Sequence, residues 1–356
     1  MDYVKKLNEL LLVTARQAAS DLHIAVGRKP TLRVDSILVP LMNEPILTKE
    51  DAEGLISALL TPEQKERFLK IKQIDFSFNY EDKARFRVNV YLQRGFMAAA
   101  LRLIPAQIHT VDELNLPPLL HDFVKLHQGF VLIVGPAGHG KSTTLAAMLD
   151  EVNHTRTEHV ITVEDPIEYL FSQDRCIVSQ REVGSDAVSF HEALRAVLRQ
   201  DPDVIMIGEM RDPETIATAM TAAETGHLVF STLHTNSASQ TIDRIIDSFP
   251  PEQQGQVVSQ LASTLVGIIS ERLVPRIGGG RIPAAEIMLT NSAIRNLIRE
   301  RKIYQIDLVI ETSVQEGMIS LNRSLVNLIK RKEISLEAAE SFSLNPAELR
   351  ILLERT

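Results

Sequence analysis

Apolar and polar residues follow two different patterns along this chain, one in the first hundred residues and one after them. Near the start, Leu7, Leu10, Leu11 and Ala15 recur at helical spacing within residues 5–20. This spacing predicts an amphipathic helix. We expect the helix to pack on its own domain, and a helix lying on a membrane surface is the alternative.

Strict alternation of apolar and polar residues begins at Asp75. It predicts a β-hairpin that turns at residues 81–83, followed by a third strand at 97–103. Residues 1–104 are therefore expected to form a small α/β domain with an antiparallel sheet. The proline-punctuated stretch 105–118 is the predicted interdomain linker.

The second pattern begins after that linker, where short apolar runs alternate with segments of helical periodicity. The strand-like runs are Phe130–Val134, His159–Val163, Val204–Ile207 and Leu228–Ser231. Strands that alternate with helices predict a parallel sheet covered on both faces. We assign residues 119–275 to this core. A glycine loop at 278–280 follows, and residues 276–356 are expected to form a mainly helical C-terminal domain.

Composition narrows the class of protein. The 356 residues carry a net charge of −8 and contain one cysteine, Cys176. One cysteine excludes an internal disulfide and a multi-cysteine zinc site. The acidic balance offers no general attraction for nucleic acid. Because we find neither a signal peptide nor a membrane-spanning apolar run, we expect a cytoplasmic protein without direct membrane insertion.

The clearest chemical signal lies between the first apolar run of the core and the helix after it. The segment is Gly135-Pro136-Ala137-Gly138-His139-Gly140-Lys141-Ser142, which fits the phosphate-binding pattern G-x-x-x-x-G-K-S/T. Its glycines let backbone amides curl around phosphates at a helix N-terminus. Lys141 is expected to reach the β- and γ-phosphates of ATP, and Ser142 to ligate Mg²⁺. Thr143 completes the predicted nucleotide-binding segment. The alternative is a glycine-rich turn that binds nothing.

Carboxylates follow two of the predicted strands. Glu164, Asp165 and Glu168 come after the second strand of the core, and Glu209 comes after the third. In open α/β sheets this end of the strands faces the ligand. ATPases of this kind need carboxylates to hold Mg²⁺ and to orient water. We favour Glu209 for metal or water contact and Glu168 as the base, and the sequence leaves open which does which.

Two histidines flank the fourth predicted strand. His234 follows the strand and is predicted to sense the γ-phosphate of the nucleotide, with a capping or core role as the alternative. His227 precedes the strand and is the weaker candidate. Neither is expected to bind a metal, because no second nitrogen or sulfur ligand lies at helical i, i+4 spacing.

Arginines line the polar positions of the N-terminal hairpin. Arg85, Arg87 and Asn89 alternate with apolar residues, and Arg102 does so in the next strand. A solvated strand face is the simplest interpretation. The sharper hypothesis is that they act as arginine fingers on a nucleotide bound by a neighbouring subunit, which requires a ring of subunits.

These segments together resemble the secretion-superfamily ATPases, and within them the type IV pilus retraction ATPases. The resemblance is carried by the phosphate-binding run and by Val163–Tyr169, Arg195–Asp212, Thr221–Ala238 and Ala293–Glu300. It implies a PAS-like N-terminal domain, a RecA-like P-loop core and a homohexamer with nucleotide between protomers. It also implies that Arg87 and Arg102 act in trans and that Asp35 lies near the nucleotide.

The same resemblance implies a place and a role in the cell. A ring of this kind acts at the inner face of the cytoplasmic membrane, on an inner-membrane platform protein, and depolymerises pilin for twitching motility. This chain departs from the family pattern at Ala137 and His139, where Thr and Ser are usual, and at residues 317–322. The departures bear on turnover and on partner identity more than on the phosphate cradle.

Three rival functions remain. A pilus extension or secretion ATPase of the same superfamily usually carries a longer N-terminal region and often a four-cysteine zinc insertion, against which the single cysteine counts. A nucleotide-regulated scaffold without turnover would not need the carboxylates of Glu168 and Glu209. A RecA-like nucleic-acid motor would need aromatic stacking platforms, and aromatic residues make up only 5% of the chain.

Overall fold

The computed structural model describes residues 2–17, 19–34, 37–80, 84–104 and 107–355. The chain separates into two compact units. The first comprises Met1–Gln107 with the short segment Pro166–Leu170, and the second comprises Ile108–Asp165 with Phe171–Thr356. Each unit has its own sheet and its own core, and each is described by itself.

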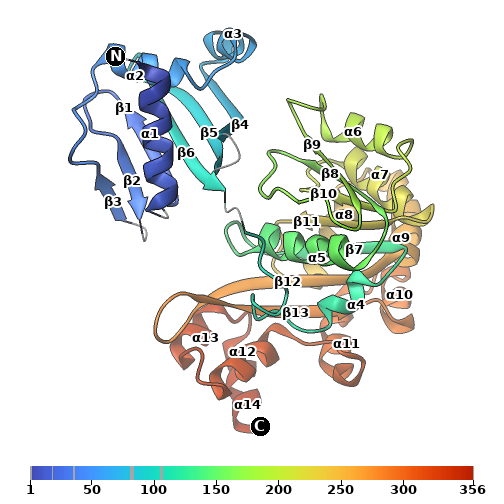
Figure 1. The fold of residues 1–356 in the computed structure, drawn as a ribbon. Coiled ribbons are helices and arrows are strands. Elements are labelled where there is room, and N and C mark those ends of the chain that lie inside the picture. The colour runs from blue at the N-terminus through green and yellow to red at the C-terminus, as the bar shows by residue number, and fades with distance from the viewer. Residues whose placement is uncertain (1, 18, 35–36, 81–83, 105–106, 356) are drawn as a thin grey trace. The chain divides into compact units, whose positions relative to one another are not determined.

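The first unit is an antiparallel sheet covered by helices (Figure 1). Its strand order is β3-β2-β1-β6-β5-β4. The strands are β1 (Asp21–Ala25), β2 (Thr31–Val34), β3 (Ile37–Pro40), β4 (Gln73–Tyr80), β5 (Ala84–Gln93) and β6 (Phe96–Ile104). The helices are α1 (Tyr3–Arg16), α2 (Lys49–Ser57) and α3 (Pro62–Ile71). This confirms the predicted antiparallel strands, although the turn at 81–83 lies outside the described residues.

The amphipathic helix predicted within residues 5–20 is α1, and it packs on its own unit. Leu7, Leu10 and Leu11 are each no more than 1% exposed and join the apolar core of the first sheet. Burial of three leucine side chains is worth several kcal/mol, at roughly 1.5–3 kcal/mol each. The expected packing of α1 on its own domain is therefore confirmed.

The second unit is built on a seven-stranded sheet of order β13-β12-β7-β11-β10-β8-β9. The strands are β7 (Gly129–Val134), β8 (His159–Glu164), β9 (Ile177–Glu182), β10 (Val204–Ile207), β11 (Leu228–Leu233), β12 (Leu265–Pro275) and β13 (Arg281–Leu289). The four strands predicted from apolar runs are β7, β8, β10 and β11, and they pair in parallel. The predicted parallel core is therefore confirmed.

Helices cover both faces of this sheet, as Figure 1 shows. Alternate residues of β7 point to opposite faces, since Leu132 belongs to one apolar cluster and Ile133 to the other. The helices are α4 (Leu120–Val124), α5 (Lys141–Thr155), α6 (Phe190–Val197), α7 (Pro213–Glu224), α8 (Ala238–Asp247), α9 (Pro251–Thr264), α10 (Ser292–Arg299), α11 (Ile306–Thr312), α12 (Leu321–Lys330), α13 (Leu336–Phe342) and α14 (Pro346–Arg355), with 3-10 turns at Ile303–Gln305 and Val314–Glu316.

The domain boundary predicted after residue 275 does not coincide with a break in the fold. Residues 276–280 are the turn of an antiparallel hairpin, because β12 pairs with β13 from Gly267↔Leu289 to Pro275↔Arg281. The glycine run is a loop, as the sequence predicts, but it closes a hairpin of the core sheet and does not open a separate C-terminal domain. Helices α12–α14 then pack on this hairpin through a fourth apolar cluster.

The predicted linker 105–118 is also shorter in the structure than in the sequence interpretation. Val111 and Leu116 are 0% and 5% exposed and belong to an apolar cluster of the second unit. The first unit ends at Gln107, so most of this stretch is part of the second unit's packing. The apolar residues of this stretch anchor it to the second unit.

Among the described residues, none of the helices combines the length and apolar character that a membrane crossing needs.

Candidate active site

The predicted phosphate-binding segment forms the turn between β7 and α5. Its three glycines have positive φ angles, 150° at Gly135, 77° at Gly138 and 95° at Gly140. A Cβ atom at Gly135 would lie 2.5 Å from the carbonyl oxygen of Glu271, so only glycine fits there without movement of β12. No side chain caps the N-terminus of α5. Its first-turn amides are therefore available for an anion.

Lys141 is the first residue of α5 and is 7% exposed. Its Nζ donates hydrogen bonds to the carbonyl oxygens of Gly135 and Pro136, both at 2.9 Å. The same Nζ lies 3.3 Å from Nδ1 of His234. The ammonium group is thus held inside the turn, close to where a phosphate chain would bind.

His234 connects this lysine to a carboxylate on the neighbouring strand. His234 follows β11, and its Nε2 lies 3.3 Å from a carboxylate oxygen of Glu209, which follows β10. Glu209 is 17% exposed and also forms an ion pair with Arg211. Because β7, β11 and β10 run in parallel and in register, their carboxyl ends meet at one edge of the sheet. Three of the predicted catalytic residues therefore lie together.

The other residues of the segment differ in exposure. Ala137, Gly138 and Ser142 are exposed, and the side chain of Ser142 starts from the first turn of α5. His139 is half-buried, and its Nδ1 accepts a hydrogen bond from the backbone N–H of Leu273 at 3.0 Å. The segment therefore exposes Ala137, Gly138 and Ser142, while His139 faces β12.

Three of the other predicted residues, Arg87, Arg102 and Glu168, belong to the first unit. Glu168 is in the segment Pro166–Leu170, and its carboxylate lies 3.9 Å from the Arg87 guanidinium. Arg102 donates through Nε to Asp21 at 3.0 Å, while its side chain stays 67% exposed. Glu168 and Arg87 thus belong to the first unit, and Glu209 belongs to the second. Asp35 lies outside the described residues.

His227 has a local structural role. Its Nδ1 lies 2.8 Å from the carbonyl oxygen of Ala222 in the last turn of α7. The ring therefore adds a contact to a carbonyl that also accepts hydrogen bonds from the backbone amides of Thr225 and His227. His227, the weaker of the two histidine candidates, thus contacts the end of α7.

Two buried carboxylates at the site were not selected from the sequence. Glu164 ends β8, is 6% exposed and accepts a hydrogen bond from the Thr162 hydroxyl at 2.7 Å. Glu271 of β12 is 1% exposed and accepts from the Thr144 hydroxyl at 3.1 Å. Burial raises the pKa of Glu271 to about 8, against the opposing effects of that hydrogen bond and of the Lys141 charge.

A signal for each was present in the sequence. Glu164 is one of the three carboxylates after the second predicted strand, where the sequence favours Glu168 as the base. Glu271 interrupts a long apolar run. A charged residue is rarely buried unless it is paired, so its presence in such a run indicates a buried polar contact. Its place beside the phosphate turn depends on the sheet order, which the run itself does not reveal.

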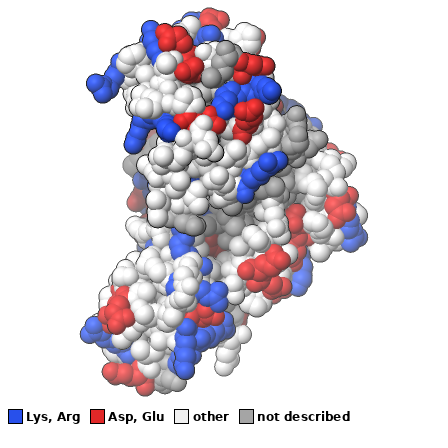
Figure 2. Space-filling model, turned by 60° about the vertical axis from the view of Figure 1, so that its left-hand side comes forward, with Lys and Arg blue, Asp and Glu red and all other residues white. Residues whose placement is uncertain are grey.

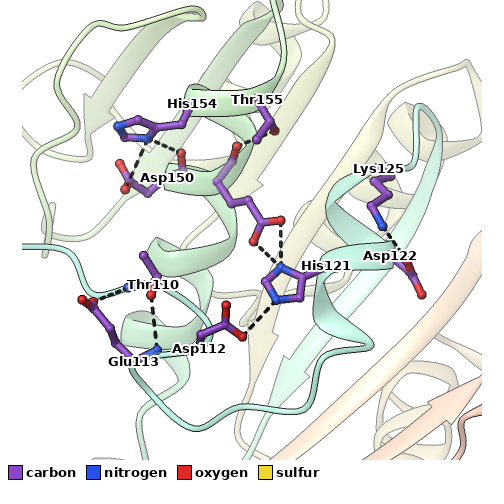
Figure 3. A network of polar contacts seen from close by, with 10 residues as sticks. Thr110, Asp112, Glu113, His121, Asp122, Lys125, Asp150, His154 and Thr155 are labelled. Atoms are coloured by element: carbon purple, nitrogen blue, oxygen red, sulfur yellow. Dashed lines mark hydrogen bonds and ion pairs between the residues drawn. The ribbon is translucent and has the colours of Figure 1, made fainter.

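A second polar network holds the opposite end of α5 (Figure 3). The His121 Nδ1 lies 2.8 and 2.7 Å from the two carboxylate oxygens of Glu151, and its Nε2 lies 3.4 Å from Asp112. One turn further on, the His154 Nδ1 lies 2.7 Å from the carbonyl oxygen of Asp150. The helix that begins at the phosphate turn is therefore tied to α4 and to the segment before it.

Charge on the visible surface is mixed. On the face drawn in Figure 2, Lys and Arg side chains are interspersed with Asp and Glu side chains. A protein that grips a nucleic-acid backbone needs a continuous basic surface. That face presents no such surface.

Comparison with known proteins agrees with the geometry. A family model described as "Type II/IV secretion system protein" matches residues 3–279. The chain is 46% identical over 333 residues to a Pseudomonas aeruginosa protein named "Type IV pilus retractation ATPase PilT", with 94% of this chain and 96% of that protein covered. A "Twitching motility protein" of Neisseria gonorrhoeae is 42% identical, with 85% of this chain and 82% of that protein covered.

A solved structure shows the same fold over almost the whole chain. The crystal structure of the pilus retraction motor PilT with bound ADP aligns with a TM-score of 0.90 and 47% identity, covering 98% of this chain and 99% of that one. The strand, glycine turn and lysine-headed helix define a P-loop ATPase. The chain belongs to the type II/IV secretion system protein family, and within it to the pilus retraction ATPases.

Proposed function

We propose that this chain binds ATP at residues 135–143 and uses its hydrolysis to drive retraction of a type IV pilus. The observation that supports this most directly is the contact chain from Lys141 through His234 to Glu209 at the mouth of the glycine turn. A turn that bound nothing would have no reason to hold an ammonium, an imidazole and a carboxylate together at one sheet edge. The name and bound ADP of the similar motor structure support the choice of nucleotide.

Each residue has a physical role in this proposal. The Lys141 ammonium would exchange the two carbonyl oxygens it now contacts for the β- and γ-phosphate oxygens, which carry full negative charge. His234 would then lie beside the γ-phosphate. Glu209 would orient the attacking water, or Glu168 would do so as the alternative base.

The donor set suits Mg²⁺. Ser142 offers a hydroxyl and Glu209 a carboxylate, and Mg²⁺ in such sites takes one or two protein ligands, completing its shell with phosphate and water. Consistent with so few protein ligands, the described part of the chain holds no cluster of three or more acidic, histidine or cysteine ligands. The bound ion would supply charge neutralisation of the triphosphate.

We further propose that the working form is a homohexamer in which Arg87 and Arg102 act on the nucleotide of a neighbouring subunit. The two arginines occupy opposed positions on β5 and β6, so they stand side by side on one face of the first sheet. Their unit carries no phosphate turn of its own. A positive charge supplied from a separate unit stabilises the transition state only when that unit reaches the phosphates.

In the cell, the proposed ring lies at the cytoplasmic face of the inner membrane and acts through a platform protein in that membrane. Movement of the ring would withdraw pilin subunits from the base of the pilus. This role follows from the relatives named for pilus retraction and twitching motility.

The lysine provides the test of the ATPase assignment. Lys141→Ala removes the ammonium that is proposed to bind the phosphates, and we expect ATP turnover to fall by a factor of 100 or more, about 3 kcal/mol of transition-state stabilisation. The measurement is phosphate release with and without DNA. Near-normal release in the variant would refute the phosphate-turn assignment, and stimulation by DNA would favour a nucleic-acid motor.

A genetic test separates retraction from its rival, extension. We expect deletion of the gene to leave cells with excess surface pili and without twitching motility, because assembly continues while disassembly stops. The measurement is surface pilin on sheared cells, scored beside motility on agar. Cells without pili would instead assign the chain to extension.

A further inference from the structure

Strand β12 extends past the end of β7 and packs against the phosphate turn. The pairing of β12 with β7 ends at Ser270↔Val134, and β12 continues to Pro275. A Cβ atom on Gly140 would lie 3.6 Å from the side chain of Leu273. Beyond Ser270, the edge of β12 that faced β7 no longer pairs with that strand. The phosphate turn lies beside β12 there instead.

His139 forms the hydrogen bond that joins the phosphate turn to β12. The Leu273 N–H donates to the His139 Nδ1 at 3.0 Å, which places the ring proton on Nε2. Burial and the charges of Arg272, Lys141 and Arg281 lower the pKa of His139 and keep Nδ1 free to accept. The two residues are 134 positions apart in the sequence, so this contact ties the turn to a distant strand.

The same imidazole also touches the C-terminal helices. Its ring centroid lies 6.1 Å from that of Phe342, with an interplanar angle of 61°, an edge-to-face arrangement. Phe342 ends α13 and packs against the apolar cluster that joins α12–α14 to the β12–β13 hairpin. One side chain in the phosphate turn therefore contacts both the core sheet and the C-terminal helices.

We propose that His139 is a positioning residue that couples the phosphate turn to helix α13 through Leu273 and Phe342. On this basis, the packing of α13 sets how readily the turn adopts its phosphate-binding shape, and nucleotide binding in turn stabilises α13. Such coupling is reciprocal by thermodynamic necessity. The proposal rests on nucleotide binding at the turn, as set out above, and adds how that site communicates with the C-terminal helices.

Two substitutions at position 139 separate the two contacts. His139→Asn keeps an acceptor oxygen near the position of Nδ1 but loses the ring that meets Phe342. His139→Phe keeps a ring but leaves the Leu273 N–H without its acceptor. Phe342→Ala removes the ring contact from the other side. Ile329→Ala, in the same apolar cluster but without a ring contact to the turn, is the matched control.

Hydrogen exchange of the full-length, nucleotide-free chain tests the contact itself. We expect the amide of Leu273 to exchange about tenfold faster in His139→Phe, for the loss of one hydrogen bond of ordinary strength, and at close to the wild-type rate in His139→Asn. Unchanged exchange in His139→Phe would overturn the proposal, whether or not the protein hydrolyses ATP.

Titration with a fluorescent ADP analogue, together with KM and kcat for ATP, tests the coupling. We expect the dissociation constant and KM to rise about tenfold in His139→Phe and about threefold in His139→Asn or Phe342→Ala, with smaller changes in kcat. Combining His139→Asn with Phe342→Ala should add nothing further, because both remove the same contact.

The outcomes distinguish this proposal from the ATPase assignment. Equal nucleotide affinity in Phe342→Ala and Ile329→Ala would overturn the coupling to α13, and so would multiplicative effects in the double variant. If the wild-type chain neither binds nor hydrolyses nucleotide, the proposed function fails. The exchange measurement still decides whether His139 holds the turn to β12.

Discussion

At the scale of single residues, burial decides the chemistry of the carboxylates in the second unit. Glu271 and Glu286 are almost completely enclosed, and burial raises their pKa values to about 8 and about 7. A carboxyl group with a raised pKa is held more easily in its protonated form. Glu209 differs from these two residues in that its side chain is partly exposed, and it lies beside the Arg211 guanidinium and the His234 ring.

Glu271 gives a prediction about stability and pH. Its folded-state pKa of about 8 exceeds the ordinary value of 4.5, so its contribution to stability is complete below pH 4.5 and is lost as the pH rises through 8. We expect Glu271→Gln, which cannot ionise, to be more stable than wild type at pH 9, by on the order of 3–5 kcal/mol. The two proteins should converge near pH 4.5.

Urea denaturation across this pH range provides the measurement for Glu271. Glu66→Gln is the control, because Glu66 is 72% exposed in a surface pair with Lys70 and should change stability little at any pH. A wild-type protein that gains stability from pH 5 to pH 9 relative to Glu271→Gln would contradict the account of this buried carboxyl.

At the scale of elements, α5 is held at both ends by other parts of the second unit. At its N-terminus the Thr144 hydroxyl bonds Glu271 of β12. Near its C-terminus Glu151 pairs with His121 of α4 (Figure 3). A helix fixed at both ends moves as a rigid body with the elements that hold it. The phosphate turn at its head is thereby linked to α4 and to the segment that leads from the first unit.

His121 gives the prediction at this scale. The hydrogen bond with Glu151 raises the pKa of His121, with Asp112 adding to the effect and burial opposing it. A raised pKa means that its stabilisation is complete below pH 6.5 and is lost as the pH rises through the folded-state value. We expect His121→Gln to be destabilised at pH 6 by about 0.5–1 kcal/mol, because the pair is partly exposed.

The loss in His121→Gln should shrink toward pH 9. Thermal unfolding at pH 6 and pH 9 measures it, and His127→Gln, whose side chain is 86% exposed, is the control. The neighbouring ion pair between Asp122 of α4 and Lys125, the residue after α4, is common to both variants. A deficit in His121→Gln that grew with pH would show that the ion pair is not its cause.

At the scale of the whole molecule, the proposed chemistry needs both units. The phosphate turn and Glu209 are in the second unit, whereas Arg87, Arg102 and Glu168 are in the first. Under the proposed function, nucleotide hydrolysis would depend on residues from both units, and movement of one unit against another is a known way to open and close such a site. Hydrolysis would then be coupled to displacement, as a motor requires.

Mixed rings test this division. We expect Arg87→Ala and Glu209→Gln each to lower turnover by a factor of 100 or more when alone, about 3 kcal/mol, while nucleotide binding stays close to wild type. Mixing the two variants should restore part of the activity, because some interfaces then combine an intact arginine with an intact carboxylate. The measurement is phosphate release as a function of mixing ratio.

The control for mixed rings is Arg87→Ala mixed with Arg102→Ala at the same ratios. If both arginines come from the same subunit, every interface in that mixture lacks one of them, and activity should stay low. Absence of rescue at any ratio of Arg87→Ala to Glu209→Gln would count against action across subunits. So would a strictly monomeric wild type with full turnover.

The sequence by itself determined those elements of this protein that depend on patterns within a few neighbouring residues. Four parallel strands of the core, helix α1, the β4–β5 pair and the phosphate turn could all be predicted, because apolar periodicity and glycine spacing act over a few residues. The lysine could be named because it belongs to the glycine pattern, and the histidine and the carboxylate because each comes within two residues of the end of a buried strand.

Only the tertiary structure decided how distant segments meet. It placed β12 beside β7, buried Glu271 under the turn, joined β13 to the core sheet and packed the proline-rich stretch onto the second unit. These features depend on sheet order and on contacts across long separations, such as that between His139 and Leu273. Local patterns carry no information about such pairings, because the free energy that selects them arises when the segments pack together.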